Sequence, residues 1–514
     1  MTYSRPGIYV TEGPFTTNVP SSPATVAAAF VGTAERGPAT PSLVQSWSSY
    51  KNQFGDLTAN YEMGYALYHF FTNGGRSAYV TRVTSGASTT AVAQSSFAGT
   101  ATSGNTAQTV FKLRAPNPGT WGNAITATVS AGSITGTTPT FNLTVLYNGV
   151  EVENWSELSL NIDNSRYISA VLNNYSAYVQ AYDVMYNTSA SAAYAAGTAY
   201  TVTTVSSPQA FTAGANGSAI TDADWARTLR LLDNVEGQLT INLVGQSSTS
   251  IVTNAISYVD ASVEGSRKNS FLVIDPDKTL TTAADINTRI QGYGSGTSYA
   301  AVYYPMLSMT NPAVRGAAAL RDTYPGGAIL GLYQRVDAER GVGRAPAGYS
   351  YTLQNAFGTT TNFTEATVGT LYNNHVNTLK NVPGAGVIVN GARTLIKTDS
   401  TKYIPSRRTL NYVKAQVEEL TKPALFQPNG PRLWTSISGS IAKMLSGLYS
   451  SGALTGNSAS EAFYVTCNAT NNTNITIDSG QVNVEVGVAL QTPAEFIVIN
   501  VSQFNGGSTV TETL

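Results

Sequence analysis

The sequence has little charge. Asp, Glu, Lys and Arg together make up only 11% of its 514 residues, against roughly 25% in an ordinary globular protein. The net charge at pH 7 is -1, from 29 Lys and Arg against 30 Asp and Glu. Because nucleic acids and anionic membranes select proteins with a basic excess, neither is an expected partner.

Cysteine and histidine are also rare. The single cysteine, Cys467, excludes a disulfide scaffold and a cysteine-based zinc site. The two histidines, His69 and His375, are too few for a His-rich metal site. No apolar run approaches the roughly 20 residues that span a bilayer, and no secretory signal is visible. We therefore expect a soluble protein, made in the cytoplasm of the cell that produces it, without cofactors.

Small polar residues and tyrosine take the place of charge. The chain has 46 Gly and 29 Tyr, and 42% of its residues are apolar, which is enough for real cores. A weakly charged, Tyr-rich surface suits extensive contact between proteins.

The order of elements predicts a multidomain chain with an α/β core and an α+β domain. The α/β segments alternate short buried strands with amphipathic helices. The insertion between them is rich in Ser, Thr and Gly, and its Asn148-Gly149 pair predicts a hairpin. We expect an extended arm at 1–23, α/β segments at 24–84 and 205–375, a β-rich, outward-facing insertion at 85–204, an α+β domain at 376–496 and a C-terminal arm at 497–514.

The α+β domain has the clearest periodicity. An amphipathic helix is expected over Arg407–Leu420, and a second begins after Asn429-Gly-Pro431. Of the three strands that follow, Gln481–Leu490 alternates without a break. Its apolar residues are Val482, Val484, Val486, Val488 and Leu490.

Few residues suit catalysis. Asp275-Pro276-Asp277 follows the strand Phe271–Ile274, where α/β folds place their chemistry, but Asp-Pro is also an ordinary turn. We expect His69 to be packed on its helix and His375 to be exposed in a polar loop. No nucleophile elbow or phosphate loop accompanies them. An α/β hydrolase using Asp275 or His69 stays open as an alternative, and so does a polysaccharide-binding adhesin.

Both ends of the chain can form strands. At the N-terminus these are Ile8, Tyr9 and Val10, and near the C-terminus the run Phe496–Val501 is apolar on both faces. Such a strand aggregates unless it is covered. It either pairs within its own domain or adds to the sheet of a neighbouring subunit.

A series of motifs runs in order along the chain. They include Pro6-Gly-Ile-Tyr-Val10-Thr-Glu12, Asn73-Gly-Gly-Arg76, Pro118-Gly-x-Trp121-Gly-Asn123, Asp337-Ala-Glu-Arg-Gly341, Gly391-Ala-Arg393 and Pro493-Ala-Glu495-Phe496. Together they resemble the contractile tail sheath proteins of bacteriophages and related injection machines. Each motif is weak alone, but their common order from residue 6 to about 501 makes the resemblance specific.

The resemblance implies a structural subunit and no enzyme. Its central domain would be subtilisin-like without a catalytic triad. Subunits would form stacked rings, usually six-fold, around an inner tail tube, bounded by baseplate and tail terminator proteins in a virion tail assembled in the host cytoplasm. Contraction would drive the tube through the target envelope. The sheath of a tailocin or another contractile injection system fits equally.

The resemblance also implies exchanged strands. The exchanged residues would be Ile8, Tyr9, Val10, Phe496, Ile497, Val498, Ile499 and Val501, and the receiving sheet would contain Val482, Val484, Val486 and Val488. We further expect hinges at Gly13-Pro14, Pro20 and Thr492-Pro493. The polar face of the 407–420 helix, with Arg407, Arg408 and Lys414, would face the tube.

Overall fold

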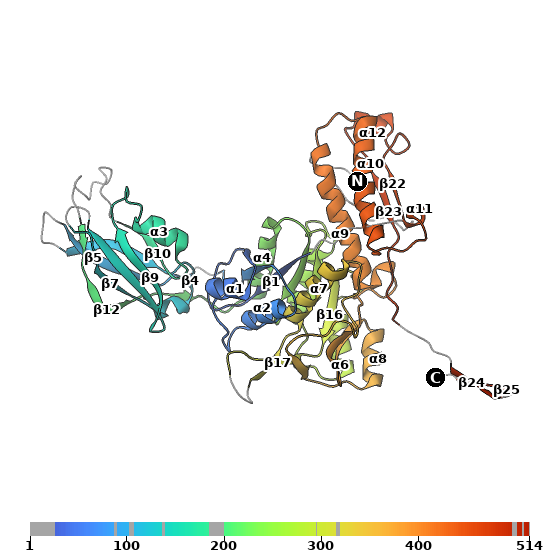
Figure 1. Ribbon diagram of the computed structural model, residues 1–514, viewed down its shortest axis with the longest axis horizontal. Helices are drawn as coiled ribbons and strands as arrows, with labels where there is room; N and C mark the ends of the chain where they lie inside the picture. Colours follow the sequence, from blue (N-terminus) through green and yellow to red (C-terminus); the bar gives the residue numbers. More distant parts are fainter. Residues whose placement is uncertain are drawn as a thin grey trace.

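The computed structural model describes residues 26–86, 90–101, 107–135, 139–184, 200–294, 296–314, 319–495, 501–505 and 508–512. It has three bodies (Figure 1). A β-rich body lies at one end, an α/β body occupies the middle, and an α+β body lies beyond it. The chain is thus a mixed α/β multidomain protein, as the sequence predicts.

An eight-stranded sheet forms the middle body. Its order is β2-β3-β1-β14-β15-β16-β20-β21. The six inner strands run parallel, and the edge strands β2 and β21 are antiparallel to their neighbours. The bounds are β1 Ala27–Gly32, β2 Ser42–Val44, β3 Ala78–Arg82, β14 Leu239–Leu243, β15 Phe271–Ile274, β16 Ala300–Tyr304, β20 Val376–Val382 and β21 Gly386–Asn390.

Helices cover both faces of this sheet. The core on one face includes α1 Trp47–Phe54, α2 Glu62–Thr72 and α7 Gly326–Arg340. The opposite core includes α4 Asp222–Arg230, α5 Thr249–Val259, α6 Ala283–Gly292 and α8 Glu365–Asn373. Because both faces are buried, the inner strands are nearly continuous apolar runs, and this is why their positions are readable from the sequence.

The β-rich body consists of two four-stranded antiparallel sheets around one core. Phe111 stacks between Phe97 and Phe141, with ring centroids 4.9 and 5.5 Å apart. One sheet contains β5 Gln94–Ala101, β6 Ala107–Arg114, β10 Gln180–Tyr182 and β11 Tyr200–Val202. The other contains β7 Ile125–Ala131, β8 Thr140–Tyr147, β9 Val150–Ser159 and β12 Val205–Ala210, and α3 Ile168–Tyr175 packs beside them.

The predicted hairpin in this body is confirmed. Asn148 and Gly149 connect β8 to β9, and both have positive φ, 50° and 77°. Two consecutive positive φ values define the turn type that the Asn-Gly pair favours.

A short pairing of β4 Thr90–Ala91 with β13 Ala215–Asn216 joins the β-rich body to the middle body. The segment that enters the β-rich body and the segment that leaves it therefore lie side by side. We call this pairing the neck. Since β12 and β13 follow residue 204, the β-rich body continues past the predicted end of the insertion.

The α+β body packs two long helices against a small sheet. Its elements are α9 Ile404–Thr421, α10 Pro431–Ser450, α11 Ala459–Ala462, β22 Phe463–Thr466, α12 Asn474–Asp478 and β23 Glu485–Val488. The predicted start of this domain at residue 376 falls within the middle body, because β20 and β21 complete the eight-stranded sheet.

Two further small sheets are present. One contains β17 Leu307–Thr310, β18 Leu320–Thr323 and β19 Ala356–Thr359. The other is an antiparallel hairpin of β24 Val501–Asn505 and β25 Ser508–Glu512, which stands apart from the three bodies (Figure 1). In the described part of the chain, no helix combines the length and the apolar character that a membrane span requires.

Candidate functional site

Asp275 lies at the carboxyl edge of the central sheet, directly after β15. Only 1% of it is exposed. Its carboxylate accepts hydrogen bonds from the backbone N–H of Gly245 and of Gly326, each at 2.9 Å. Burial raises the pKa of Asp275 to about 6, although these hydrogen bonds and Asn242 oppose the rise. A titrating carboxyl at this edge is what an α/β enzyme would need.

The surroundings of Asp275 leave no room for a substrate. A Cβ added to Gly326 would lie 2.3 Å from Nδ2 of Asn242 and 2.6 Å from Oδ1 of Asp275. The carboxylate is therefore packed against the N-terminus of α7, whose positive end favours an anion. Asp277 forms an ion pair with Arg289, with 2.9 Å between Oδ2 and Nη2. The geometry supports the structural interpretation of Asp275-Pro276-Asp277.

Neither histidine forms part of a catalytic pair. His69 is fully buried on α2, and burial lowers its pKa to about 4, so the ring is neutral. The expectation that His375 is exposed is wrong: it is 4% exposed, and its Nδ1 lies 2.9 Å from the carbonyl oxygen of Thr394. Among the described residues, no three His, Cys, Asp or Glu side chains are grouped as a metal site.

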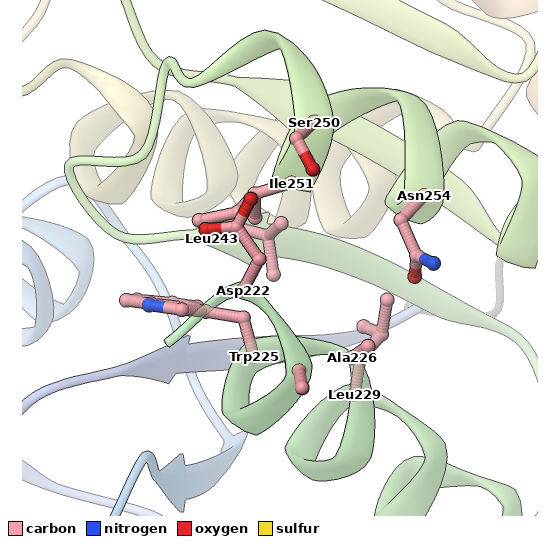
Figure 2. A pocket seen from close by; sticks show the side chains of 9 residues that line it. Asp222, Trp225, Ala226, Leu229, Leu243, Ser250, Ile251 and Asn254 are labelled. Atoms are coloured by element: carbon pink, nitrogen blue, oxygen red, sulfur yellow. The ribbon is translucent and has the colours of Figure 1, made fainter. Parts of the chain in front are cut away.

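A small pocket lies between α4 and α5 (Figure 2). Trp225, Leu229 and Ile251 form its apolar wall, and Asp222 and Asn254 lie among its polar lining residues. Its volume is about 190 Å³, below the several hundred Å³ of a typical ligand site. It gives no basis for assigning a substrate.

The predicted receiving strand is shorter than expected. β23 covers only Glu485–Val488 and pairs, antiparallel, with β22. Val482, Val484 and Val486 are partly buried, and Val488 is buried. In the described part of the chain this sheet has two strands, and we call it the open sheet because no third described strand pairs with either long edge.

The proposed donors of exchanged strands are only partly within the described structure. Ile8, Tyr9, Val10, Phe496, Ile497, Val498 and Ile499 lie outside the described residues. Val501 begins β24, in the hairpin with β25.

The cations expected to face the tube are instead buried. Arg407 and Arg408 are each 1% exposed, and Lys414 is 8% exposed. Arg408 makes a two-pronged ion pair with Asp337 of α7, at 2.9 and 2.5 Å. Burial opposes its charge, but attraction to Asp337 outweighs this and raises the pKa of Arg408. This face of α9 packs inside the subunit and does not form an outer surface.

Sequence reasoning missed two ion pairs that join distant segments. One is Arg408–Asp337, and the other is Arg393–Glu495, at 2.7 Å. Asp337, Arg393 and Glu495 lie in the motifs that carry the family resemblance, but the motifs do not show which residues meet. Pairing between residues about 70 or 100 positions apart needs the three-dimensional fold.

Among the described residues, the carboxyl edge of the central sheet is packed around Asp275, and the two-stranded sheet of the α+β body pairs with no third strand. Residues 218–395 match the family model of the phage tail sheath protein central domain, and residues 396–504 match the phage tail sheath C-terminal domain. The two matches adjoin and together cover more than half of the chain. The chain belongs to the phage tail sheath family, as a contractile sheath subunit and not an enzyme.

Solved sheath structures have the same fold. The sheath of an extracellular contractile injection system, PVC, in the contracted state is 19% identical over 98% of both chains, with a TM-score of 0.57. The contracted helical sheath of the anti-feeding prophage is 19% identical over 98% of this chain and 100% of that one, with a TM-score of 0.56.

A crystallised relative shows the same likeness. The sheath tail protein Lin1278 of Listeria innocua is 14% identical over 91% of this chain and 95% of that one, with a TM-score of 0.62. A search of curated proteins gave no match.

Proposed function

We propose that this subunit polymerises helically around an inner tail tube and that contraction of the polymer drives the tube through a target envelope. Family membership supports this proposal, and two of the similar structures are sheaths in a contracted state. The subunits stack in rings of six, bounded by baseplate and tail terminator proteins, and assemble in the host cytoplasm. A phage tail and a tailocin or other injection system both fit.

The observation that carries this proposal is the open sheet of β22 and β23. Its four-residue strands are too short and too few to be stable alone. The partly buried Val482, Val484 and Val486 need a cover. Strands of neighbouring subunits, Ile8–Val10 and Phe496–Val501, complete the sheet by main-chain hydrogen bonds. Each bond contributes only about 0.5–1.5 kcal/mol, but several arms per subunit make the lattice cohesive.

The helical geometry follows from this exchange. A head-to-tail contact that repeats with a translation does not close, so it extends into a tube. The central domain, with its parallel sheet between helices, is a subtilisin-like fold without a triad, in which Asp275 supports α7.

We assign the tube contact to α10 in place of α9. Arg432 and Lys443 are exposed on α10, and this helix carries no acidic residue. Between them the exposed residues are small, so a partner surface can approach closely. An acidic tube surface would complement this face.

Electron microscopy of the purified protein tests the proposal. We expect tubes or stacked rings from the full-length chain and their loss when residues 1–20 are removed. Val486→Lys, in the receiving strand, should also abolish assembly. The matched control is Val150→Lys in β9, where the valine is 65% exposed, and this variant should assemble normally.

The possible outcomes separate the parts of the proposal. Tubes from the chain without residues 1–20 would contradict the need for the N-terminal arm. Tubes from Val486→Lys would contradict the receiving role of β23. Full-length subunits that stay monomeric, even with the cognate tube protein, would overturn polymerisation itself.

A further inference from the structure

A strap of residues 489–495 connects the α+β body to the start of the C-terminal arm. It begins directly after β23, where the backbone N–H of Ala489 donates to the carbonyl oxygen of Ala462 at 3.4 Å, and two further hydrogen bonds hold it along its course. The backbone N–H of Thr455 donates to the carbonyl oxygen of Ala489 at 3.2 Å. The hydroxyl of Ser406, in the first turn of α9, donates to the carbonyl oxygen of Gln491 at 3.3 Å.

The strap ends in a stronger attachment. Nη2 and Nε of Arg393 donate to the carboxylate of Glu495 at 2.7, 3.2 and 3.3 Å. The guanidinium also lies 3.7 Å from the ring centroid of Tyr372. The side chains of Arg393 and Glu495 are only 14% and 12% exposed. A planar guanidinium that is both stacked and paired with a carboxylate is well ordered. We call this arrangement the clasp.

The clasp belongs to the middle body. The backbone N–H of Arg393 donates to Oδ1 of Asn377 in β20 at 2.7 Å, and its carbonyl oxygen accepts from Nδ2 of Asn377 at 2.8 Å. Since both bonds use the backbone of Arg393, its side chain can be replaced without releasing the loop. Glu495 is therefore tied to the loop that flanks β20 of the central sheet, and the same loop pairs with the residue before α9 through the bridge of Arg393 with Tyr403.

The clasp is charged at neutral pH. Burial opposes ionisation of Glu495, but hydrogen bonds from Arg393, Tyr372 and Tyr403 outweigh it and lower the pKa of this carboxyl. A folded-state pKa below the usual value means that the contribution of the clasp is complete above the ordinary glutamate pKa and is lost only in stronger acid.

We propose that Arg393 is a positioning residue that holds Glu495 and so fixes the point at which the C-terminal arm leaves the subunit. The arm then pivots at the Glu495–Phe496 bond, and the Thr492-Pro493 hinge expected from the sequence is immobilised within the strap. This inference rests on the proposed exchange of the C-terminal arm. Its consequence is that a pull on the arm reaches the central sheet directly, without loading the small sheet of β22 and β23.

Cleavage by an endoproteinase specific for glutamate tests the clasp in the isolated full-length subunit. The enzyme must take the Glu495 side chain into its own pocket, so the clasp has to open before cleavage. We expect Arg393→Gln to be cleaved after Glu495 about tenfold faster than the wild type, as loss of a charge-assisted pair allows. The cleavage rate of Arg393→Lys should lie between the other two, because lysine keeps the positive charge but lacks the planar two-donor geometry of the guanidinium.

Arg321 supplies a matched control. It pairs with Glu62 at 2.7 Å and lies 4.1 Å from the ring of Tyr65, so it repeats the clasp at another place. Arg321→Gln should lower the melting temperature by a comparable amount and leave the rate of cleavage after Glu495 unchanged. An unchanged rate in Arg393→Gln, or an equal rise in Arg321→Gln, would overturn the clasp.

Electron microscopy after mild shear tests the mechanical role. We expect tubes of Arg393→Gln and of Glu495→Gln to be several-fold shorter than wild-type tubes, and tubes of Arg321→Gln to keep the wild-type length. Equal lengths in all four proteins would overturn this role. If the wild type itself forms no tubes, the proposed polymerisation fails, and the cleavage rates still decide the clasp separately.

Discussion

At the scale of single residues, the buried charges of this subunit are structural. Asp275 supports the N-terminus of α7, and Arg408 and Glu495 each tie one segment to another. A single sequence shows that such residues are charged but not whether they are buried or which residues they contact. For this reason the sequence leaves a catalytic role for Asp275 open beside the favoured turn, and it predicts a tube-facing position for Arg408.

Asp275 should give the isolated subunit a measurable pH dependence. Its folded-state pKa is about 6 against an ordinary 3.8, so the folded protein binds this proton more tightly than the unfolded chain does. The stabilising effect of that proton is complete below about pH 4 and is lost as the pH rises past 6, by up to about 3 kcal/mol. Chemical denaturation between pH 5 and 8 measures it.

Asp275→Asn is the reference for this measurement, because it removes the titration but keeps the shape. The wild type should gain stability relative to this variant as the pH falls from 7.5 to 5. A difference that is constant over this range would show that burial does not shift the pKa of Asp275.

At the scale of elements, the sequence predicts strands where both faces are buried. β15 has the predicted bounds, Phe271–Ile274, because its apolar run is uninterrupted. β23 is four residues long where ten were expected. Alternation identifies the faces of a strand, but only a partner decides how much of it pairs. The polar face of α9 was misassigned because its partner, Asp337, is 71 residues away.

The pair between α9 and α7 makes a second prediction. Arg408→Met leaves Asp337 as an unpaired buried charge and should lower the free energy of unfolding by about 3–5 kcal/mol. Asp337→Leu should do the same. The double variant should recover most of the loss, since an apolar pair replaces two charges that are costly to desolvate. Urea denaturation of the four proteins forms a double-mutant cycle, and additive losses would contradict coupling between the two residues.

At the scale of the whole molecule, the three bodies have separable tasks. The central sheet is the largest sheet of the described chain, and the proposed function assigns assembly to the α+β body with its two-stranded sheet. The β-rich body shares no described strand with either. The composition of the sequence predicts this insertion, but not that its last strands follow residue 204, because a composition change is gradual where a strand boundary is sharp.

Excision of the β-rich body should therefore leave assembly intact. Thr90 and Asn216 are register partners in the neck, so two glycines in place of residues 91–215 can bridge them. Arg36 loses its stacking on Tyr178, at 4.1 Å, and Arg36→Ser should be included to remove the uncovered charge. We expect tubes of unchanged length and smaller diameter by electron microscopy. Loss of tubes in a folded, excised subunit would show that this body contributes contacts between subunits.

The neck also has a consequence for what the family can vary. A domain whose first and last strands pair with each other is attached to the middle body at one place. The middle body therefore needs only the two paired ends and not a particular domain between them. Any foreign domain with adjacent termini meets the same geometric requirement. A domain inserted in this way would be repeated once per subunit along the proposed sheath polymer. The polymer could therefore display an antigen or an enzyme in a dense, regular array.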